Sequence, residues 1–349
     1  MSYKQMTGNI ISATKVEPDG KFITSAASGV WSLQEQYDYV RGGNWPNAAN
    51  PVPTYIIAGG STRAGGDDSS NIINTGNITT LANSSDFGDL TDGRQKFASC
   101  ASTTRALFAG GQRAGESDTN IIDYVTIAST GNASDYGDLL AAQYGVCGTS
   151  SATRAIFGMG YYSSSQRDII QYKTITSSGN TSDFGNLTVA RYQGSACASS
   201  AGRAVFMNGR AGSSDSNVID YVTIASTGNA SDFGDTTQGR MNTGASSSST
   251  RGISGSGING STAAIYNIID YITIASTGNA SDFGDLSASR GSISSASSNI
   301  RALFGGGNGP SNVIDYVTIA TTGNASDFGD LTTAVEWPTG CSNSHGGVQ

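Results

Sequence analysis

Ionisable side chains are scarce in this chain of 349 residues. Charged residues make up 13% of it, about half of the ~25% typical of soluble proteins. The only histidine is His345, so a Ser-His-Asp triad would depend on that residue alone. Glutamate occurs only at Glu17, Glu35, Glu116 and Glu336. A glycosidase carboxylate pair would therefore have to come from aspartates. These shortages predict a protein that is not an enzyme and that holds no cofactor.

Positive charge and long apolar segments are also lacking. The 19 lysines and arginines are outnumbered by 27 aspartates and glutamates, which gives a net charge of −8. Nucleic acids and anionic membranes attract basic patches, so neither is expected as a partner. No apolar run approaches the roughly 18 residues of a membrane span. The first residues, MSYKQMTGN, lack the apolar core of a signal peptide, so we expect synthesis in the cytoplasm.

Proline is rare, with 6 residues, whereas glycine is abundant, with 47. The glycines show no three-residue period, which excludes a collagen-like chain. A chain rich in Gly, Ser, Thr and Asn is also typical of disordered linkers. Regular β-branched runs favour short strands joined by tight turns instead.

One phrase recurs along the chain. It reads IASTGNASDY at residues 127–136 and is followed by Gly137 and Asp138. Its final aromatic residue recurs at Phe87, Tyr136, Phe184, Phe233, Phe283 and Phe328. Repeats at a period near 50 residues indicate a repeat architecture, and about 50 is the kelch period.

Each repeat contains four segments typical of strands. In the second repeat they are residues 97–102, 105–111, 120–127 and 133–139. The third segment is largely apolar on both faces, so both must be covered, as in a propeller blade between two others. The first repeat starts at Tyr55 with a second strand, and the last ends at 338–344 with a first strand. We therefore expect a six-bladed β-propeller over 55–349 that the C-terminal strand closes. The later blades are expected to begin near Arg94, Gln143, Arg191, Arg240 and Arg290.

Residues 1–54 do not repeat and form a separate segment. Ser32 to Glu35 is a capping box that predicts a short helix to about Val40. The prolines of 51–53 predict a stiff connector. The segment is rich in large apolar side chains, at Trp31, Leu33, Tyr37, Tyr39, Val40 and Trp45. Such a surface needs a partner, which is either the flank of the propeller or another chain. The stiff connector favours another chain.

Four cysteines stand at Cys100, Cys147, Cys197 and Cys341. Three of them lie 13 residues after the repeat aromatic. Equivalent positions in separate repeats do not generally approach within disulfide range. No C-x-x-C motif is present and there is one histidine, so zinc is not expected. We expect buried free thiols.

The repeated aspartates, such as Asp135 and Asp138, allow two interpretations. They are oxygen ligands suited to Ca²⁺, or they pair with arginine. Arg105, Arg154, Arg203, Arg251 and Arg301 begin second strands. The first Asp of each pair begins a fourth strand at the same end of a blade, which favours a repeated Arg–Asp link. The many Asn-x-Ser/Thr sequences are interpreted as turn residues and not as glycosylation sites.

The loops between second and third strands vary in length and content. They span 61–70, 112–119, 161–166, 210–216, 258–266 and 308–311. All six emerge on one face of the ring. The candidate binding residues in them are Arg63, Arg113, Tyr161, Tyr162, Arg210 and Tyr266. Loops on a rigid scaffold often carry binding, but drift where packing is loose explains the variation equally well.

The repeats resemble kelch repeats. Gly59-Gly60, Gly110-Gly111 and Gly306-Gly307 stand where kelch has its double glycine, and Tyr124 and its counterparts match the kelch tyrosine. Arg94, Arg191, Arg240 and Arg290 match its arginine. Phe or Tyr replaces the kelch tryptophan, and three glycine pairs become Met159-Gly160, Asn208-Gly209 and Ser256-Gly257. The resemblance covers 55–349 and implies a kelch-like propeller.

A narrower resemblance concerns tailed phages. The phrases DYVTIASTGNASDFGD at 220–235 and SGVWSLQEQYDYVRGGNWP at 28–46 resemble segments of tailed-phage virion proteins, especially those of marine phages. This resemblance implies a tail fibre or tail-tip protein that contacts a host-surface glycan or protein. The alternatives are a capsid or tail decoration protein and a propeller hydrolase. In this interpretation residues 1–54 dock on other virion proteins or self-associate, with Trp31, Leu33, Tyr37, Tyr39 and Trp45 as contacts.

Overall fold

The computed structural model describes residues 52–65, 68–115, 117–199 and 202–348. The predicted helix near 32–40 and the expected attachment residues Trp31, Leu33, Tyr37, Tyr39 and Trp45 lie outside the described residues. The unit that begins at Pro53 is described below by itself.

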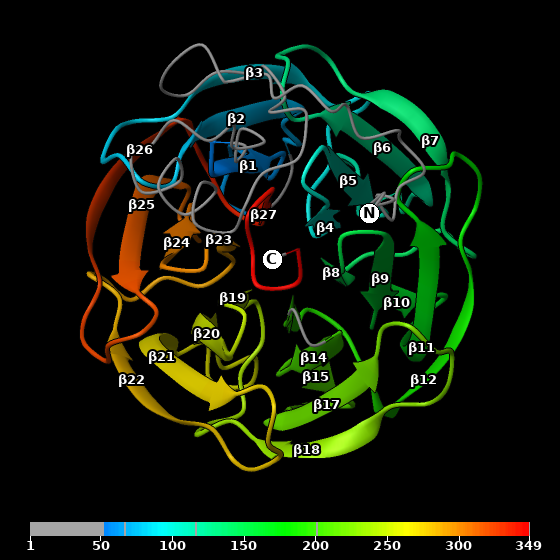
Figure 1. Cartoon of the computed structure of the whole chain (residues 1–349), viewed down its shortest axis with the longest axis vertical. Coiled ribbons are helices and arrows are strands. Elements are labelled where there is room, and N and C mark those ends of the chain that lie inside the picture. Colours follow the sequence, from blue (N-terminus) through cyan, green and yellow to red (C-terminus); the bar gives the residue numbers. More distant parts are fainter. Residues whose placement is uncertain (1–51, 66–67, 116, 200–201, 349) are drawn as a thin grey trace, which may run out of the picture. The chain divides into compact units, whose positions relative to one another are not determined.

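This unit is an all-β, six-bladed propeller, as the repeats predict (Figure 1). Blade 1 consists of β27 (Thr339–Ser342), β1 (Thr54–Ala58), β2 (Ile72–Asn77) and β3 (Ser85–Asp89). Blade 2 consists of β4 (Ala98–Ala101), β5 (Arg105–Ala109), β6 (Ile121–Thr126) and β7 (Ser134–Asp138). Blade 3 consists of β8 (Cys147–Ser150), β9 (Arg154–Gly158), β11 (Ser165–Thr174) and β12 (Ser182–Arg191), and the short β10 (Tyr161–Tyr162) pairs with β11.

The remaining three blades repeat this order. Blade 4 consists of β13 (Ser195–Ala198), β14 (Arg203–Met207), β17 (Val218–Thr223) and β18 (Ser231–Asp235). A separate ribbon joins β15 (Arg210–Ala211) to β16 (Ser214–Asp215). Blade 5 consists of β19 (Gly244–Ser247), β20 (Arg251–Ile258), β21 (Ile265–Thr273) and β22 (Ser281–Asp285). Blade 6 consists of β23 (Ser294–Ser297), β24 (Arg301–Gly305), β25 (Ser311–Thr318) and β26 (Ser326–Val335). The described residues contain no helix.

Side chains are small in the innermost strand of each blade and large in the second strand. The innermost strands carry small side chains, as in ASCA of β4 and SSAS of β23, because six strands converge there. The second strands carry the large apolar residues, and Phe108 of β5 and its counterparts Phe157, Phe206 and Phe304 are fully buried. In the outermost strand of blade 2, Tyr136 is buried, the two residues before it are exposed and the two after it are half-buried.

The hydrophobic core lies between blades and not within them. One cluster joins Ile56 of blade 1 to Phe97 and Phe108 of blade 2. A similar cluster lies at each of the other five interfaces between neighbouring blades, which we call seams. Each fully buried large apolar side chain contributes about 1.5–3 kcal/mol relative to exposure. A blade is therefore stable only with its neighbours in place.

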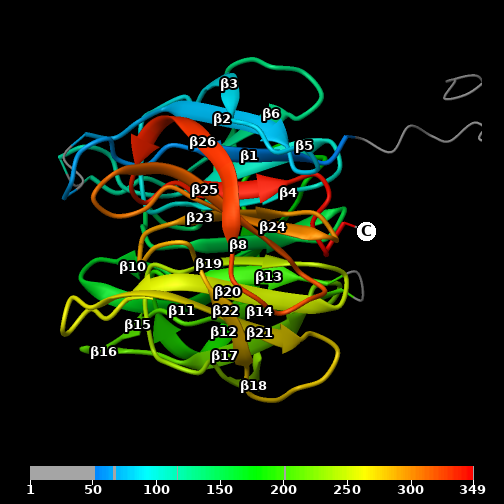
Figure 2. The same ribbon diagram turned by 90° about the vertical axis from the view of Figure 1, so that its left-hand side faces the viewer.

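Blade 1 draws its strands from both ends of the described chain. β27 pairs antiparallel with β1, with Tyr55 opposite Ser342 and Ala58 opposite Thr339. Figure 2 shows the two faces from the side. We call the side with the second-to-third strand loops, which carries β10, β15 and β16, the loop face. The opposite side carries the third-to-fourth strand turns and the tail 343–348, and we call it the turn face.

Candidate functional site

The repeated phrase links neighbouring blades at the ring's outer edge. The side chain of Asn132, in the third-to-fourth turn of blade 2, accepts the N–H of Asp89 of blade 1 at 3.1 Å. Beside it, the N–H of Gly131 donates to the carbonyl of Phe87 at 2.7 Å. The same asparagine bond occurs at all six seams, from Asn83, Asn132, Asn180, Asn229, Asn279 and Asn324. These asparagines are turn residues, and their side chains also stabilise the ring.

The predicted pairing of the second-strand arginines with the repeated aspartates is wrong. Arg105 Nη1 donates to the Tyr136 hydroxyl and to the carbonyls of Ile175 and Thr176, which follow β11 of blade 3. Its four counterparts likewise reach carbonyls of the next blade, at Ile224, Ile274, Ile319 and Ile78. The turn carbonyls of the next blade lie closer to these arginines than the repeated aspartates do, because the blades are stacked side by side around the ring. The first aspartate of the pair is exposed, and Asp135 Oδ1 accepts the N–H of Gly137 in its own strand.

The fully buried ion pairs are formed by arginines at the connections between blades, of which Arg191 is the last residue of β12. Arg94 Nη2 lies 3.0 Å from Asp123 Oδ2, and both side chains are fully buried. Burial lowers the pKa of Arg94, and the nearby Asp123 carboxylate opposes that shift. The same pair occurs as Arg191–Asp220, Arg240–Asp270 and Arg290–Asp315. Blade 3 has Gln143 and Gln171 at these positions, and blade 1 has Val335 and Asn74.

Two further expectations concern metals and thiols. No group of three or more His, Cys, Asp or Glu side chains that could hold a metal ion occurs among the described residues. All four cysteines are buried free thiols, as the sequence predicts. Burial raises the pKa of Cys147, Cys197 and Cys341 to about 12, so these thiols stay protonated and unreactive at neutral pH.

A circle of backbone hydrogen bonds surrounds the axis at the loop face. It joins one residue from each link between blades, namely Lys96, Gly145, Gln193, Asn242, Ser292 and Trp337. The N–H of each residue donates to the carbonyl of the residue before it, at 2.7–2.9 Å, and the N–H of Lys96 closes the circle on Trp337 at 3.3 Å. All six have positive φ, including 56° at Lys96 and 54° at Trp337. This conformation is an outlier for a bulky residue.

The circle forms the mouth of an axial pocket of about 110 Å³. Below the mouth the pocket is lined by the inner strands of five blades and by β27. The wall is rich in hydroxyl groups, including Ser99, Ser195, Thr243, Ser294, Ser295 and Thr339. At the mouth, Lys96 Nζ lies 4.4 Å from the centre of the Trp337 ring and donates to Gln112 Oε1 at 3.2 Å. The pocket therefore combines one cation, one indole and many small polar groups.

The tail 343–348 occupies the axis at the turn face, where Figure 1 shows the C-terminal end at the ring centre. His345 Nε2 lies 2.9 Å from the carbonyl of Ala101, and His345 Nδ1 accepts the N–H of Gly347. The N–H of Gly346 donates to Ser247 at 3.0 Å. A Cβ at Gly347 would lie 2.1 Å from the carbonyl of Ser150, so only glycine fits. The tail blocks the turn-face end of the axis, and the pocket opens on the loop face.

The loop residues selected from the sequence do not form one site. Arg63 is exposed, and Arg113 forms an ion pair with Asp92. Tyr162 is 39% exposed. Tyr266 lies in β21 opposite Gly257.

Tyr161 packs in a cluster of three tyrosine rings. Its ring centre lies 5.4 Å from that of Tyr144 and 5.0 Å from that of Tyr192. Tyr144 in turn lies 5.6 Å from Lys96 Nζ. Lys96, Tyr144, Tyr192 and Trp337 are not among the binding residues that the sequence predicts. Aligning the links between blades would have placed Lys96 and Trp337 at one equivalent position.

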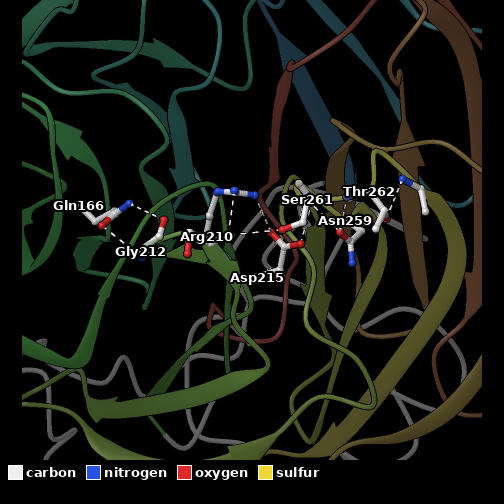
Figure 3. A network of polar contacts seen from close by, with 10 residues as sticks. Gln166, Arg210, Gly212, Asp215, Asn259, Ser261 and Thr262 are labelled. Carbon is white, nitrogen blue, oxygen red and sulfur yellow. Dashed lines mark hydrogen bonds and ion pairs between the residues drawn. The ribbon is translucent and has the colours of Figure 1, made fainter.

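Arg210 belongs to a network that joins the loops of blades 3, 4 and 5 (Figure 3). Its Nη1 lies 3.3 Å from Asp215 Oδ1, and Asp215 Oδ2 accepts the N–H of Gly260 at 2.8 Å. Gln166 and Gly212 exchange two hydrogen bonds on the other side. Arg210 therefore holds neighbouring loops in place.

Comparisons with known proteins give no family. No family model matches the chain, and no curated protein matches it. Within the described residues no helix is long and apolar enough to cross a membrane.

Proposed function

We propose that this protein is a non-enzymatic component of a tailed-phage virion, of the tail fibre or tail-tip type, whose loop face binds a host-surface glycan. The single observation that carries the binding role is the axial pocket, which opens on the loop face and is lined by Lys96, Trp337 and hydroxyl groups. Aromatic rings and convergent polar groups in a concave site are the usual features of a ligand pocket. The phage assignment rests on the resemblance of residues 28–46 and 220–235 to virion proteins.

The proposal includes a division of labour along the chain. Residues 1–54 anchor the protein to other virion proteins or to a second copy, and the propeller, of kelch-like type, presents the loop face outwards. The C-terminal strand β27 closes the ring by completing blade 1, which its register with β1 supports. The protein is made in the host cytoplasm and ends on the tail or capsid surface.

A decoration protein with a purely structural role is the second candidate. The fixed loops of blades 3 to 5 favour it, because the Arg210–Asp215 network serves packing and leaves those loops little freedom to adapt to a ligand.

The test combines location with binding. Immunogold labelling of particles with antibody against the propeller should mark the tail, and the purified full chain should bind specific members of an array of bacterial surface polysaccharides. Label on the capsid together with no array binding would support the decoration role. Depolymerisation of any array polysaccharide would overturn the non-enzymatic assignment.

A further inference from the structure

Each blade forms a short backbone pair at the loop face, next to the circle around the pocket mouth. One residue of the pair comes directly before a member of the circle, and the other lies at or beyond the end of the second strand. Five of the pairs are single β-bridges, and in blade 6 the N–H of Asn308 donates to the carbonyl of Gly291 at 2.8 Å. These equivalent positions allow the six blades to be compared. In the order of blades 1 to 6, the pairs are Glu336–Ser61, Gln95–Gln112, Tyr144–Tyr161, Tyr192–Arg210, Met241–Ile258 and Gly291–Asn308.

The side chains of these pairs divide the mouth into two halves. In blades 6, 1 and 2 they are small or polar, and all but Asn308 are buried. In blades 3 to 5, five of the six are large and aromatic or aliphatic, and all five are partly exposed. We call these five residues the apolar arc, namely Tyr144, Tyr161, Tyr192, Met241 and Ile258. Because the backbone pairing is the same in both halves, the ring itself does not require large apolar side chains at the arc.

Three tyrosines make up one end of the apolar arc. The ring centre of Tyr144 lies 5.4 Å from that of Tyr161 and 6.0 Å from that of Tyr192, and the last two lie 5.0 Å apart. A Cβ at Gly145 of the circle would lie 3.1 Å from Tyr192 Cδ2, so this ring borders the circle. A tyrosine combines apolar ring area with a hydroxyl group. The cluster therefore suits a ligand that has an apolar face and polar groups at its edge.

The cations beside the apolar arc have acidic groups near them. Arg210 Nη1 lies 3.3 Å from Asp215 Oδ1. The Lys96 ammonium acts on the carboxylate of Glu336, where it opposes the rise in pKa that burial causes, and it donates to Gln112 at 3.2 Å. Because these charges are balanced locally, the arc favours an uncharged ligand.

Size decides what the apolar arc accommodates. A stable protein interface takes about 20–30 residues from each partner, whereas the arc has five side chains and faces a polar half. The axial pocket measures about 110 Å³, which is less than the ~150 Å³ of a cavity that holds one benzene ring. A sugar ring is therefore too large for the pocket and lies outside it. A pyranose ring carries C–H groups on its faces and hydroxyl groups at its edge, which matches the tyrosine cluster.

We propose that one uncharged pyranose ring of a glycan packs on Tyr144, Tyr161 and Tyr192 at the apolar arc, beside the mouth of the axial pocket. This inference deepens the proposed glycan binding and rests on it for its biological meaning. The contact itself is tested independently, with free glycosides.

The experiment titrates the full chain with methyl β-galactoside, methyl β-glucoside and glucuronate, and ligand-observed NMR measures binding. At least one neutral glycoside should bind saturably at millimolar concentrations, and glucuronate should bind no more tightly. The double variant Tyr144→Gln/Tyr161→Gln copies the Gln95–Gln112 pair of blade 2, so it suits the backbone. It should weaken glycoside binding about ten-fold, which corresponds to ~1.4 kcal/mol. Tyr144→Phe/Tyr161→Phe keeps both rings and should retain most of the affinity.

Leu81→Thr/Ile300→Thr is the matched control. It removes two apolar side chains from the turn face, which are 54% and 66% exposed, and copies Thr130 and Thr104 of blade 2. Glycoside binding should be unchanged in this variant. Melting curves verify that all three variants are folded.

Three results would overturn the inference: no saturable binding of either neutral glycoside, unchanged binding by the double glutamine variant, or equal weakening by the control. Binding of a host-surface protein that the double glutamine variant loses, without glycoside binding, would assign the apolar arc to a protein partner and also overturn it. Polysaccharide binding on the array that the double glutamine variant leaves intact would overturn the arc alone and keep the proposed function. Glycoside binding at the arc without array binding would do the reverse.

Discussion

Blade 1, which is assembled from two distant parts of the chain, differs from the five continuous blades. Each of those begins its second strand with an arginine that lies over a tyrosine of the third strand, as Arg154 lies 4.6 Å from the Tyr172 ring centre. Blade 1 has Thr54 and Thr75 at these positions. The N–H of Thr54 instead donates to Asn343 Oδ1 at 2.8 Å, just beyond β27. This bond lies within blade 1, and the seam between blades 1 and 2 lacks the arginine that the other five seams have.

Blade 1 has a tyrosine in its second strand, Tyr55, and none in its third strand, where Thr75 stands. Tyr55 of β1 is fully buried, and its ring centre lies 6.0 Å from that of Phe328 of blade 6. Gly76 of β2 faces it, where blade 2 has Val125, and a Cβ at Gly76 would lie 2.6 Å from the Tyr55 ring. Tyr55 therefore packs in the seam with blade 6, which also has Tyr316, whereas the cluster between blades 1 and 2 contains no tyrosine.

Deleting residues 338–349 should have the largest effect, because it removes β27 and leaves the β1 edge unpaired. We expect aggregation or failure to fold, since exposed strand edges recruit other chains. Size-exclusion chromatography and circular dichroism measure this. Deleting 344–349 is the control, because it keeps β27 and Asn343, and it should give a soluble protein with a lower melting temperature. A soluble 1–337 chain with unchanged melting would show that the ring closes without β27.

Breaking one buried ion pair should have the second-largest effect on stability. Asp220→Ala leaves Arg191 buried without its carboxylate and should lower the free energy of unfolding by ~3–5 kcal/mol. The double variant Arg191→Gln/Asp220→Gln copies blade 3, where Gln143 and Gln171 stand in place of the ion pair. It should be clearly more stable than Asp220→Ala, because no unpaired charge is buried. Urea denaturation compares the two, and equal losses would show that the charge itself is irrelevant.

Gly76→Val gives blade 1 the residue of blade 2 and should cost about 1–3 kcal/mol through overpacking. The clash is with the Tyr55 ring. The same change made in a Tyr55→Ala background should therefore cost much less. A double-mutant cycle of unfolding free energies gives this coupling. Additive effects would mean that Tyr55 and Gly76 do not depend on each other.

The smallest effect should come from pH at the tail. Burial lowers the pKa of His345, whose Nδ1 accepts an N–H and cannot do so once protonated. The unfolded chain, with a pKa near ~6.5, then binds the proton more readily than the folded chain. Stability should be complete above that pKa and fall as pH drops below it. The melting temperature of His345→Gln should decline less between pH 7.5 and 5.5, and parallel declines would exclude the histidine.

Local pattern was enough to predict the architecture. The 45–50-residue spacing of the repeat aromatic, the four strand segments per repeat and the Gly-Asn turns come from the sequence, because strand and turn formation depend on neighbouring residues. The six blades, their starting points and the buried free cysteines are confirmed in the described part of the chain. Short-range pattern carries this information because five of the six blades are continuous in the chain.

The partners across seams were decided only by the tertiary structure. Arg105 lies 70 residues from Ile175, whose carbonyl it binds, and Asp135 was the wrong partner although its charge is complementary. The circle from Lys96 to Trp337 likewise joins residues that meet only when the ring is closed. Sequence specifies which groups need partners. The distance between them is set by blade stacking, and that distance decides which partner each group obtains and where the pocket lies.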